Sequence, residues 1–251
     1  MSTTSLVISK VTGLANPTRF LALAARMIPW MAVITVLLFA AGLYMSFAST
    51  SDYQQGYTVR IMYVHVPAAW LAMMCYSVMA LSAIGTLVWR HPLADVANKA
   101  AAPLGAAFTA LALYTGALWG RPTWGTFWEW DGRMTSTLVL LLIYLGIVAL
   151  WRAFDDQIKA GRIVAIVTLI GGINIPIIKF SVDWWNTLHQ SASVFTADGP
   201  RMPASLLTPL LVMLLAFTLL GILLGLIRMR TEILRRRADS MSRQAAMGAG
   251  Q

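Results

Sequence analysis

Charged side chains are scarce in this sequence, and their absence from long stretches indicates the fold class. Only 12% of the 251 residues are Asp, Glu, Lys or Arg, whereas 58% are hydrophobic; a soluble domain carries about twice that charged fraction. Six blocks hold no charged residue: 27–51, 61–89, 100–120, 134–151, 163–178 and 202–227. Because about 20 apolar residues suffice for a helix to cross a bilayer core of ~30 Å, the blocks predict six transmembrane helices.

The sequence has a single cysteine and no nucleotide-binding motif. The single cysteine, Cys75, lies inside the second apolar block, which excludes an intrachain disulfide and a cysteine-pair metal site. The sequence has no GxxxxGK[ST] loop and no GxGxxG after a strand. Any energy drawn from ATP must therefore come from a partner protein.

The predicted architecture is an all-α bundle of six helices in a single membrane domain over residues 1–237. We expect residues 238–251 to form a flexible cytoplasmic tail. The fifth block is the shortest, and its 16 residues would rise only ~24 Å, so Lys179 is expected to extend toward the interface while the helix continues. The stretch "GGINIP" at 171–176 predicts a kink in this helix. The expected helices run over about 28–48, 63–88, 100–119, 134–151, 163–180 and 205–227.

The distribution of basic residues predicts the orientation of the bundle. If the N-terminus is cytoplasmic, the inner segments hold 14 of the 19 Lys and Arg residues and the outer segments hold five. This excess predicts that both termini are cytoplasmic. The net charge of +9 then reflects orientation and contact with anionic membrane lipid, and nucleic acid is not an expected partner. A cleaved signal peptide ending near Ala48 is the alternative, but the apolar run is long for one.

Tryptophan is concentrated on the predicted outer side. The stretch "TWGTFWEWDG" at 123–132 lies in the loop between the third and fourth helices, and "VDWWNTLHQ" at 182–190 lies in the last outer loop. An aromatic belt at the membrane interface is one interpretation. The clustering favours the other, a platform for a planar, apolar molecule. The outer tryptophans are Trp119, Trp124, Trp128, Trp130, Trp184 and Trp185.

Two of the three histidines lie on the same side as these tryptophans. His65 is in "YVHVPAAW" and His189 in "NTLHQ", whereas His91 is on the inner side and is interpreted as an interface residue. Two imidazoles can fill both axial positions of a heme iron, and indoles can stack on the porphyrin. Arg121 and Arg133 are then candidates for the heme propionates.

Asp131 closes the tryptophan cluster, and two roles remain open for it. Its carboxylate could cap the fourth helix and order the loop, or it could contact the heme directly. In either case no nucleophile of this chain is implicated, so we expect a heme-handling protein that is not an enzyme in the ordinary sense.

The motifs "WGTFWEWD", "HVPAAW" and "WWNTLHQ" together resemble the heme exporter protein C (CcmC) family of bacterial cytochrome c maturation. The first fits the WGxxWxWD signature of heme-handling proteins, and the resemblance covers nearly all of 20–230. It implies a multi-pass protein of the inner membrane that holds heme b on the periplasmic side. By resemblance, the tryptophan segment is 119–131 and the axial ligands are His65 and His189. The two tails and 191–205 match poorly.

The resemblance also implies a set of partners and a transfer step. The family passes heme to a periplasmic heme chaperone, CcmE, to which it becomes covalently attached, so the chain would have at most a heme-lyase-like role. The other implied partners are a small single-span subunit, CcmD, and an ATP-binding-cassette (ABC) transporter pair, CcmA and CcmB.

Two other functions remain possible from the sequence. A cytochrome-b-like electron-transfer subunit would carry its heme histidines within facing helices, whereas His65 and His189 both lie near one surface. A transporter of heme or another solute would place polar groups near the bilayer midplane, whereas all six apolar blocks lack charges.

The first prediction concerns orientation. Reporter fusions at residues 126 and 190 should report a periplasmic position, and fusions at 95, 157 and 240 a cytoplasmic one, because the basic residues favour cytoplasmic termini. The measurement is paired alkaline phosphatase and fluorescent-protein activity at each position. A cytoplasmic signal at 126 would contradict the orientation and place the tryptophans on the wrong side for the predicted role.

Overall fold

The computed structural model describes residues 16–185, 187–189, 194, 196 and 199–248, and over these ranges it is almost entirely helical. Six of its helical segments are long and apolar enough to cross a membrane, which confirms the predicted six-helix class. The described residues contain no β-strand, only an isolated bridge between Asp52 and Gly56. The elements are α2 (Pro17–Ala48), the 3₁₀-helix η1 (Tyr57–Ile61), α3 (Met62–Val88), α4 (Ala94–Trp124), α5 (Gly132–Ala153), α6 (Gln157–Gly171), α7 (Asn174–Trp184) and α8 (Ala204–Gly248).

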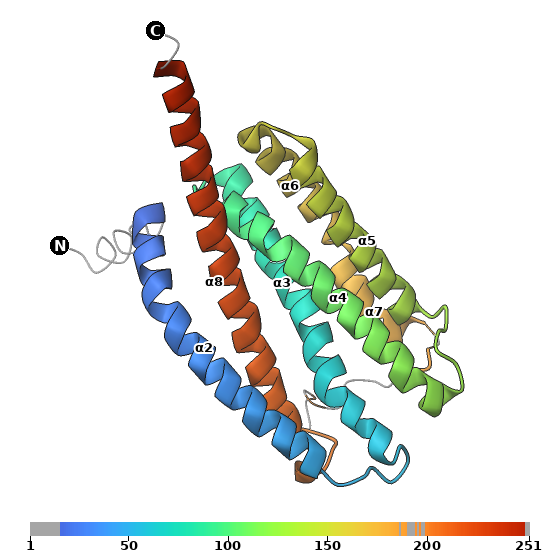
Figure 1. The fold of residues 1–251 in the computed structure, drawn as a ribbon. Coiled ribbons are helices and arrows are strands. Elements are labelled where there is room, and N and C mark those ends of the chain that lie inside the picture. Colours follow the sequence, from blue (N-terminus) through green and yellow to red (C-terminus); the bar gives the residue numbers. More distant parts are fainter. Residues whose placement is uncertain (1–15, 186, 190–193, 195, 197–198, 249–251) are drawn as a thin grey trace, which may run out of the picture.

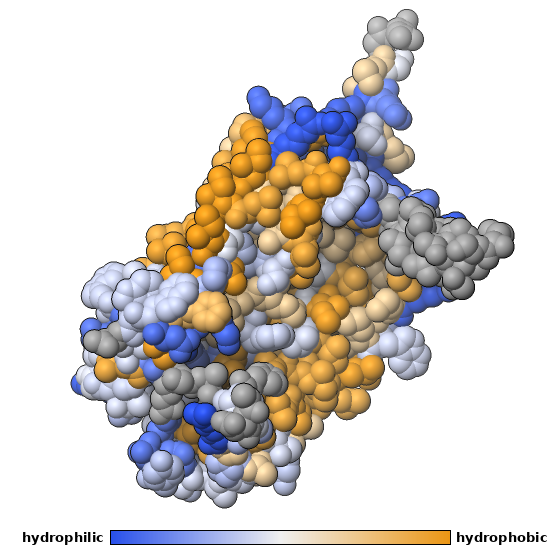
Figure 2. Space-filling model, turned by 180° about the vertical axis from the view of Figure 1, so that it is seen from behind, coloured by the Kyte–Doolittle hydropathy of each residue, from blue (hydrophilic) through white to orange (hydrophobic). Residues whose placement is uncertain are grey.

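The helices run up and down and divide the bundle into three parts (Figure 1). α3 and α4 pack against each other in the middle, α2 packs on α8 along one side, and α5, α6 and α7 cover the other. The start of α2 and the end of α8 lie at one end, which we call the basic end. The loop from α4 to α5 lies at the opposite end, the tryptophan end. Figure 2 shows a broad apolar band between two more polar ends, as a bilayer requires.

Two helices extend by more than ten residues beyond a predicted end, whereas α4 and the fifth crossing extend by four to six residues at each end. α2 begins at Pro17, because the Asn16 side chain accepts a hydrogen bond from the Thr18 N–H (2.8 Å) and proline suits the first helical turn. α8 continues to Gly248, so residues 238–248, expected as a flexible tail, are helical. No Gly or Pro stops α8 after residue 227, and Glu232 pairs with Arg235 and Arg236 one turn later.

The fifth membrane crossing is broken where the sequence predicted a kink. α6 ends at Gly171 and α7 begins at Asn174. The Gly172 N–H still donates to the Thr168 carbonyl (3.0 Å), and that carbonyl also accepts from the Tyr76 hydroxyl (2.8 Å). The Asn174 amide donates to the Ser136 carbonyl of α5 (2.9 Å). Side chains of neighbouring helices thus satisfy backbone groups at the break, as hydrocarbon surroundings demand.

Tyr144 of α5 occupies the centre of the core and depends on a glycine opposite. It is fully buried, its hydroxyl donates to the Ala72 carbonyl of α3 (2.6 Å), and its ring meets that of Tyr76 at 5.4 Å between centroids. The ring lies directly against Gly105 of α4, where a Cβ would overlap its edge and its hydroxyl. Glycine therefore allows α4 and α5 to approach closely at this level.

The second prediction tests this close approach. Gly105→Ala should lower the free energy of unfolding by about 1–3 kcal/mol, because the added methyl overpacks the core and displaces Tyr144 from its hydrogen bond. Gly146→Ala in α5 is the matched control, since a Cβ there meets no atom within 4 Å. The measurement is thermal unfolding in detergent. Unfolding is monitored through the reaction of Cys75, which is buried in the folded protein, with a fluorogenic thiol reagent. Equal midpoints for the two variants would contradict the packing argument.

Candidate functional site

The tryptophan end is built on the turn between α4 and α5. α4 ends at Trp124 because Gly125 adopts a left-handed conformation (φ 82°), which returns its N–H to the Arg121 carbonyl. Six residues later the Asp131 carboxylate begins α5, accepting a hydrogen bond from the Met134 N–H through Oδ1 (2.7 Å). The loop is thus fixed at both ends, and the predicted capping role of Asp131 agrees with this geometry.

His65 lies in the first turns of α3 and faces α4. Its Nδ1 is 3.0 Å from the Ala112 carbonyl oxygen and 3.2 Å from the Thr115 hydroxyl. A carbonyl only accepts, so Nδ1 carries the proton and Nε2 keeps its lone pair. The imidazole also lies against Gly116, where a Cβ would come within 2.9 Å of Cε1. Glycine at this position leaves room for the ring.

His189 lies in the loop between α7 and α8 and is oriented by Asp131. Its Nδ1 is 2.7 Å from Asp131 Oδ2, and the Thr187 hydroxyl donates to the same carboxylate oxygen. A carboxylate accepts hydrogen bonds, so Nδ1 is again the protonated nitrogen and Nε2 is left with its lone pair. Asp131 therefore has two structural roles: Oδ1 caps α5, and Oδ2 orients the His189 ring.

Burial and hydrogen bonds oppose each other in setting the charge of this pair. Burial alone would raise the pKa of Asp131, but hydrogen bonds from Thr187, the Met134 N–H and His189 outweigh it and lower the pKa. For His189, burial outweighs the attraction of Asp131 and lowers the pKa below its usual range. The ground state at neutral pH is therefore an ionised carboxylate beside a neutral imidazole.

Each histidine is contacted by one tryptophan of α4. The rings of Trp119 and His65 meet edge to face at 5.7 Å between centroids, and those of Trp124 and His189 at 4.8 Å. The Trp119 indole N–H donates to the Gln55 side chain (2.9 Å), which fixes the orientation of this ring. α4 therefore brings two of the predicted tryptophans to the two predicted histidines.

The remaining outer tryptophans form two separate groups. Trp128 and Trp130 pack edge to face at 5.2 Å, with Trp130 exposed and the Trp128 indole nitrogen buried without a hydrogen-bond partner among the described residues. Trp184 stacks on Phe180 at 5.5 Å and is more than half exposed, as expected of a membrane-interface residue. Trp185 packs against Gly132, at the first turn of α5.

The two arginines predicted for the site are placed differently. Arg133 is half-buried, lies within electrostatic reach of His65, His189 and Asp131, and its Nε has no hydrogen-bond partner in the described part of the chain. Arg121 is exposed, donates to the Gly125 carbonyl and lies over the Phe127 ring. The geometry thus favours Arg133 over Arg121 as a group available to an anion.

Three residues that shape the site were missed from the sequence. Thr187 donates to the Asp131 carboxylate and Gln55 accepts from the Trp119 indole, whereas Gly116 leaves room for the His65 ring. Thr187 lies inside the motif "WWNTLHQ" two residues before His189, so its proximity was a usable signal. Gln55 and Gly116 come from separate segments and gave none.

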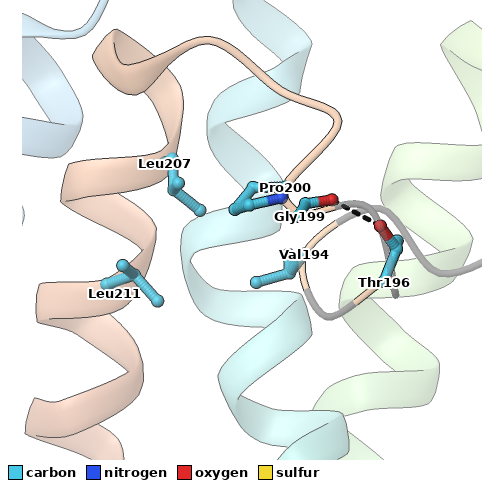
Figure 3. A pocket seen from close by; sticks show the side chains of 6 residues that line it. All are labelled: Val194, Thr196, Gly199, Pro200, Leu207 and Leu211. Carbon is cyan, nitrogen blue, oxygen red and sulfur yellow. Dashed lines mark hydrogen bonds between the residues drawn. The ribbon is translucent and has the colours of Figure 1, made fainter.

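Two cavities of the bundle lie away from these residues. One of about 490 Å³ is bordered by Val194, Thr196, Gly199, Pro200, Leu207 and Leu211, between the outer loop and the first turns of α8 (Figure 3). Another of about 600 Å³ runs between α5 and the α6 segment and is also apolar. Neither lining includes an imidazole or a charged side chain, so neither offers an iron ligand. Among the described residues there is also no cluster of three or more His, Cys, Asp or Glu that could hold a bare metal ion.

The third prediction follows from the lowered pKa values of His189 and Asp131. The unfolded chain protonates these groups at higher pH than the folded protein does, so unfolding takes up protons and stability falls on acidification. The loss should begin below about pH 6.5 for His189 and continue below about pH 4 for Asp131. The measurement is the unfolding midpoint in detergent between pH 8 and pH 4. His189→Ala should flatten the first part of the curve and His91→Ala should not; an unchanged slope in His189→Ala would contradict the assignment.

The sequence matches known proteins over most of its length. The sequence model of the heme exporter protein C family matches residues 10–244. The chain is 62% identical to heme exporter protein C of Bradyrhizobium diazoefficiens over 245 residues, covering 94% of this chain and 93% of the relative. It is 46% identical to heme exporter protein C of Escherichia coli K12 over 222 residues, covering 88% and 89% of the two chains.

The sequence is also similar to a plant protein. The chain is 44% identical to a putative cytochrome c biosynthesis ccmC-like mitochondrial protein of Marchantia polymorpha over 196 residues, covering 78% of this chain and 83% of the relative. The match to the family model spans all six membrane crossings, and together with these relatives it confirms the family predicted from the three motifs. With its motif residues gathered at one end of six spanning helices, this chain belongs to the heme exporter protein C family.

Proposed function

We propose that this protein binds heme b at the tryptophan end and delivers it to a periplasmic heme chaperone during maturation of c-type cytochromes. The observation that carries the proposal is that two histidines have the same hydrogen-bonding arrangement. His65 and His189 come from segments 124 residues apart, yet each has Nδ1 engaged by a protein acceptor and Nε2 left for iron. Family membership supports the same function, since the relatives are named heme exporter proteins.

The hydrogen bonds at Nδ1 are the kind that prepares histidine to bind a metal. A carboxylate or carbonyl that accepts from one ring nitrogen fixes the tautomer, holds the ring and increases the basicity of the other nitrogen. Asp131 does this for His189 (2.7 Å) and the Ala112 carbonyl does it for His65 (3.0 Å). His65 and His189 are therefore the two residues of this chain that we assign as axial ligands.

Unpartnered donors at the same end suit the rest of the ligand. Arg133 Nε and Trp128 Nε1 are buried N–H groups without an acceptor among the described residues, and a buried unpaired donor costs about 1–3 kcal/mol. A propionate carboxylate would supply the missing acceptor. Trp119 and Trp124 contact the two imidazoles and would border the porphyrin beside its axial ligands.

The place of the site supports delivery over transport through the bundle. Asn98 lies inside the membrane region, and its amide donates to the Met79 carbonyl (3.3 Å) and to the Thr168 hydroxyl (3.2 Å). Groups satisfied in this way do not line a polar path. The site lies on loops and helix ends at one surface, where a docked chaperone can reach a ring that two histidines hold in place.

The same placement disfavours an electron-transfer subunit. Such a protein passes electrons between hemes or quinones within the bundle, whereas His65 and His189 lie at the tryptophan end and His91 lies at the basic end, its Nδ1 accepting from the Leu93 N–H (3.2 Å). We further propose that the membrane is the bacterial inner membrane with the tryptophan end periplasmic. The proposed partners beyond the chaperone are a single-span subunit and an ABC transporter pair.

The fourth prediction concerns the axial pair. Purified protein with bound heme should give a six-coordinate, low-spin absorption spectrum near neutral pH, which fades on acidification as protons compete with iron for Nε2. His65→Ala or His189→Ala should open one position and shift the spectrum toward high spin. Added imidazole should partly restore the original spectrum, because it fills the vacated position.

The controls separate ligation from folding. His91→Ala lies at the opposite end and should leave the spectrum unchanged. Asp131→Asn keeps the shape of the side chain but weakens the orienting bond, so it should lower heme content by about tenfold, within the range for residues behind a metal ligand. Unaltered low-spin spectra in both single histidine variants would assign the iron to other residues.

A further inference from the structure

The last quarter of α8 stands outside the bundle. α8 has 45 residues, so it is about 67 Å long at 1.5 Å per residue, more than twice the ~30 Å of a bilayer core. Its charge-free part ends at Ile227, and Figure 1 shows the helix continuing past the ends of its neighbours at the basic end. Every residue from Ala238 to Gly248 is exposed. We call residues 238–248 the α8 extension.

The base of the α8 extension is held rigidly. Glu232 is nearly buried and pairs with Lys99 of α4 (2.9 Å) and with Arg236 (2.8 Å), and Arg236 pairs with Asp95 of α4 (2.7 Å). A small apolar cluster backs these pairs, made of Leu93, Val96 and Ile233 with Phe20, Leu21 and Met229. The direction in which α8 leaves the bundle is therefore set by contacts on α2 and α4.

One face of this helix carries an apolar stripe at coiled-coil spacing. Leu234, Ala238, Met241 and Ala245 follow one another at intervals of four, three and four residues, which places them on one side of the helix. Leu234 is 46% exposed and Met241 68% exposed. Glu232 and Arg236, which bind α4, lie on the opposite side, so the stripe faces away from the bundle.

The charges beside the stripe select what can cover it. Arg237 directly precedes Ala238, and Arg230 lies seven residues earlier on the same flank. Arg235, which also pairs with Glu232, follows Leu234 on the other flank. From residue 228 to 248 there are six arginines against two carboxylates. A second copy of this chain would enter the membrane in the same direction and pair in parallel, which would set these arginines against one another. The flanks therefore exclude self-pairing and fit acidic side chains.

A lipid surface fits the geometry less well than a protein helix. Met241 lies fourteen residues beyond Ile227, which is about 21 Å along the axis, whereas the headgroup layer is only about 5–8 Å thick. Since the base is fixed on α4, the extension cannot turn down onto the membrane without breaking its ion pairs. The partner that covers the stripe is therefore a protein segment in the aqueous phase.

We propose that the α8 extension is a docking site for an amphipathic helix of another protein, with an apolar face and acidic flanks. Leu234, Ala238, Met241 and Ala245 would pack against that face, and Arg230, Arg235 and Arg237 would pair with its carboxylates. The interaction is independent of heme binding and lies at the other end of the molecule.

The fifth prediction uses a synthetic helical probe of about four heptads with leucine and alanine in its core positions and glutamate on both flanks. Fluorescence anisotropy with the full-length protein in nanodiscs of phosphatidylcholine measures its affinity. The glutamate peptide should bind, and a peptide with lysine in place of each glutamate should not. Met241→Glu should weaken binding by about tenfold or more, because it places a carboxylate in the apolar core.

Met247→Glu is the matched control, since Met247 is 67% exposed on the same extension but lies off the stripe. Its affinity should stay within about twofold of the wild type. Equal binding of both peptides, no binding of either, or equal loss in both variants would overturn the proposal. So would protection of a fluorophore at Met241→Cys upon adding phosphatidylglycerol to the nanodisc, because the extension would then lie on lipid.

Discussion

Within hydrocarbon a polar group has no water to bond, and this constraint governs how the helices of this bundle are joined. Asn98 shows the consequence most clearly. Its amide donates to the Met79 carbonyl of α3 (3.3 Å) and the Thr168 hydroxyl of α6 (3.2 Å), and its carbonyl oxygen accepts from the Trp151 indole of α5 (3.3 Å). One residue of α4 thus contacts three neighbouring helices. Tyr144 makes a comparable link between α5 and α3, so the helices are held in register by a few obligatory hydrogen bonds.

The same constraint confines the clusters of ionisable side chains to the two ends of the bundle. Ionisable groups cluster where water is near: Asp131 with the neutral imidazole of His189 at the tryptophan end, and Glu232 with Lys99 and Arg236 at the basic end. The first of these pairs orients an imidazole and caps a helix with a single carboxylate. Loss of that carboxylate would affect α5 and His189 together, so the fold and the site share one dependence there.

The fold class could be read from the sequence because charge is a strict signal in a membrane. The gaps between charges located all six crossings, and "GGINIP" located the break between α6 and α7. The ends of α2 and α8 could not be located in this way, since helices continue into water without any change of hydrophobicity at their true ends. Asn16 caps the start of α2 with a hydrogen bond, and the ion pairs of Glu232 support the continuation of α8 beyond residue 227.

The site was predictable in its members but not in their roles. The predicted side of the membrane and the sequence motifs pointed to His65, His189 and the tryptophans. The contact of Asp131 with His189 joins residues 58 positions apart, so only the folded structure could show it. The distinction between Arg133 and Arg121 was likewise invisible in sequence, where both are simply basic residues near tryptophan.

α4 connects the two ends of the molecule through a single element. Its first turns carry Asp95 and Lys99, which hold α8, and its last turns carry Trp119 and Trp124, which touch the two histidines. Its 31 residues extend over about 46 Å. The position of the two indoles and the anchoring of α8 therefore depend on one and the same helix, so a change that shifts α4 at either end of the bundle would be felt by both.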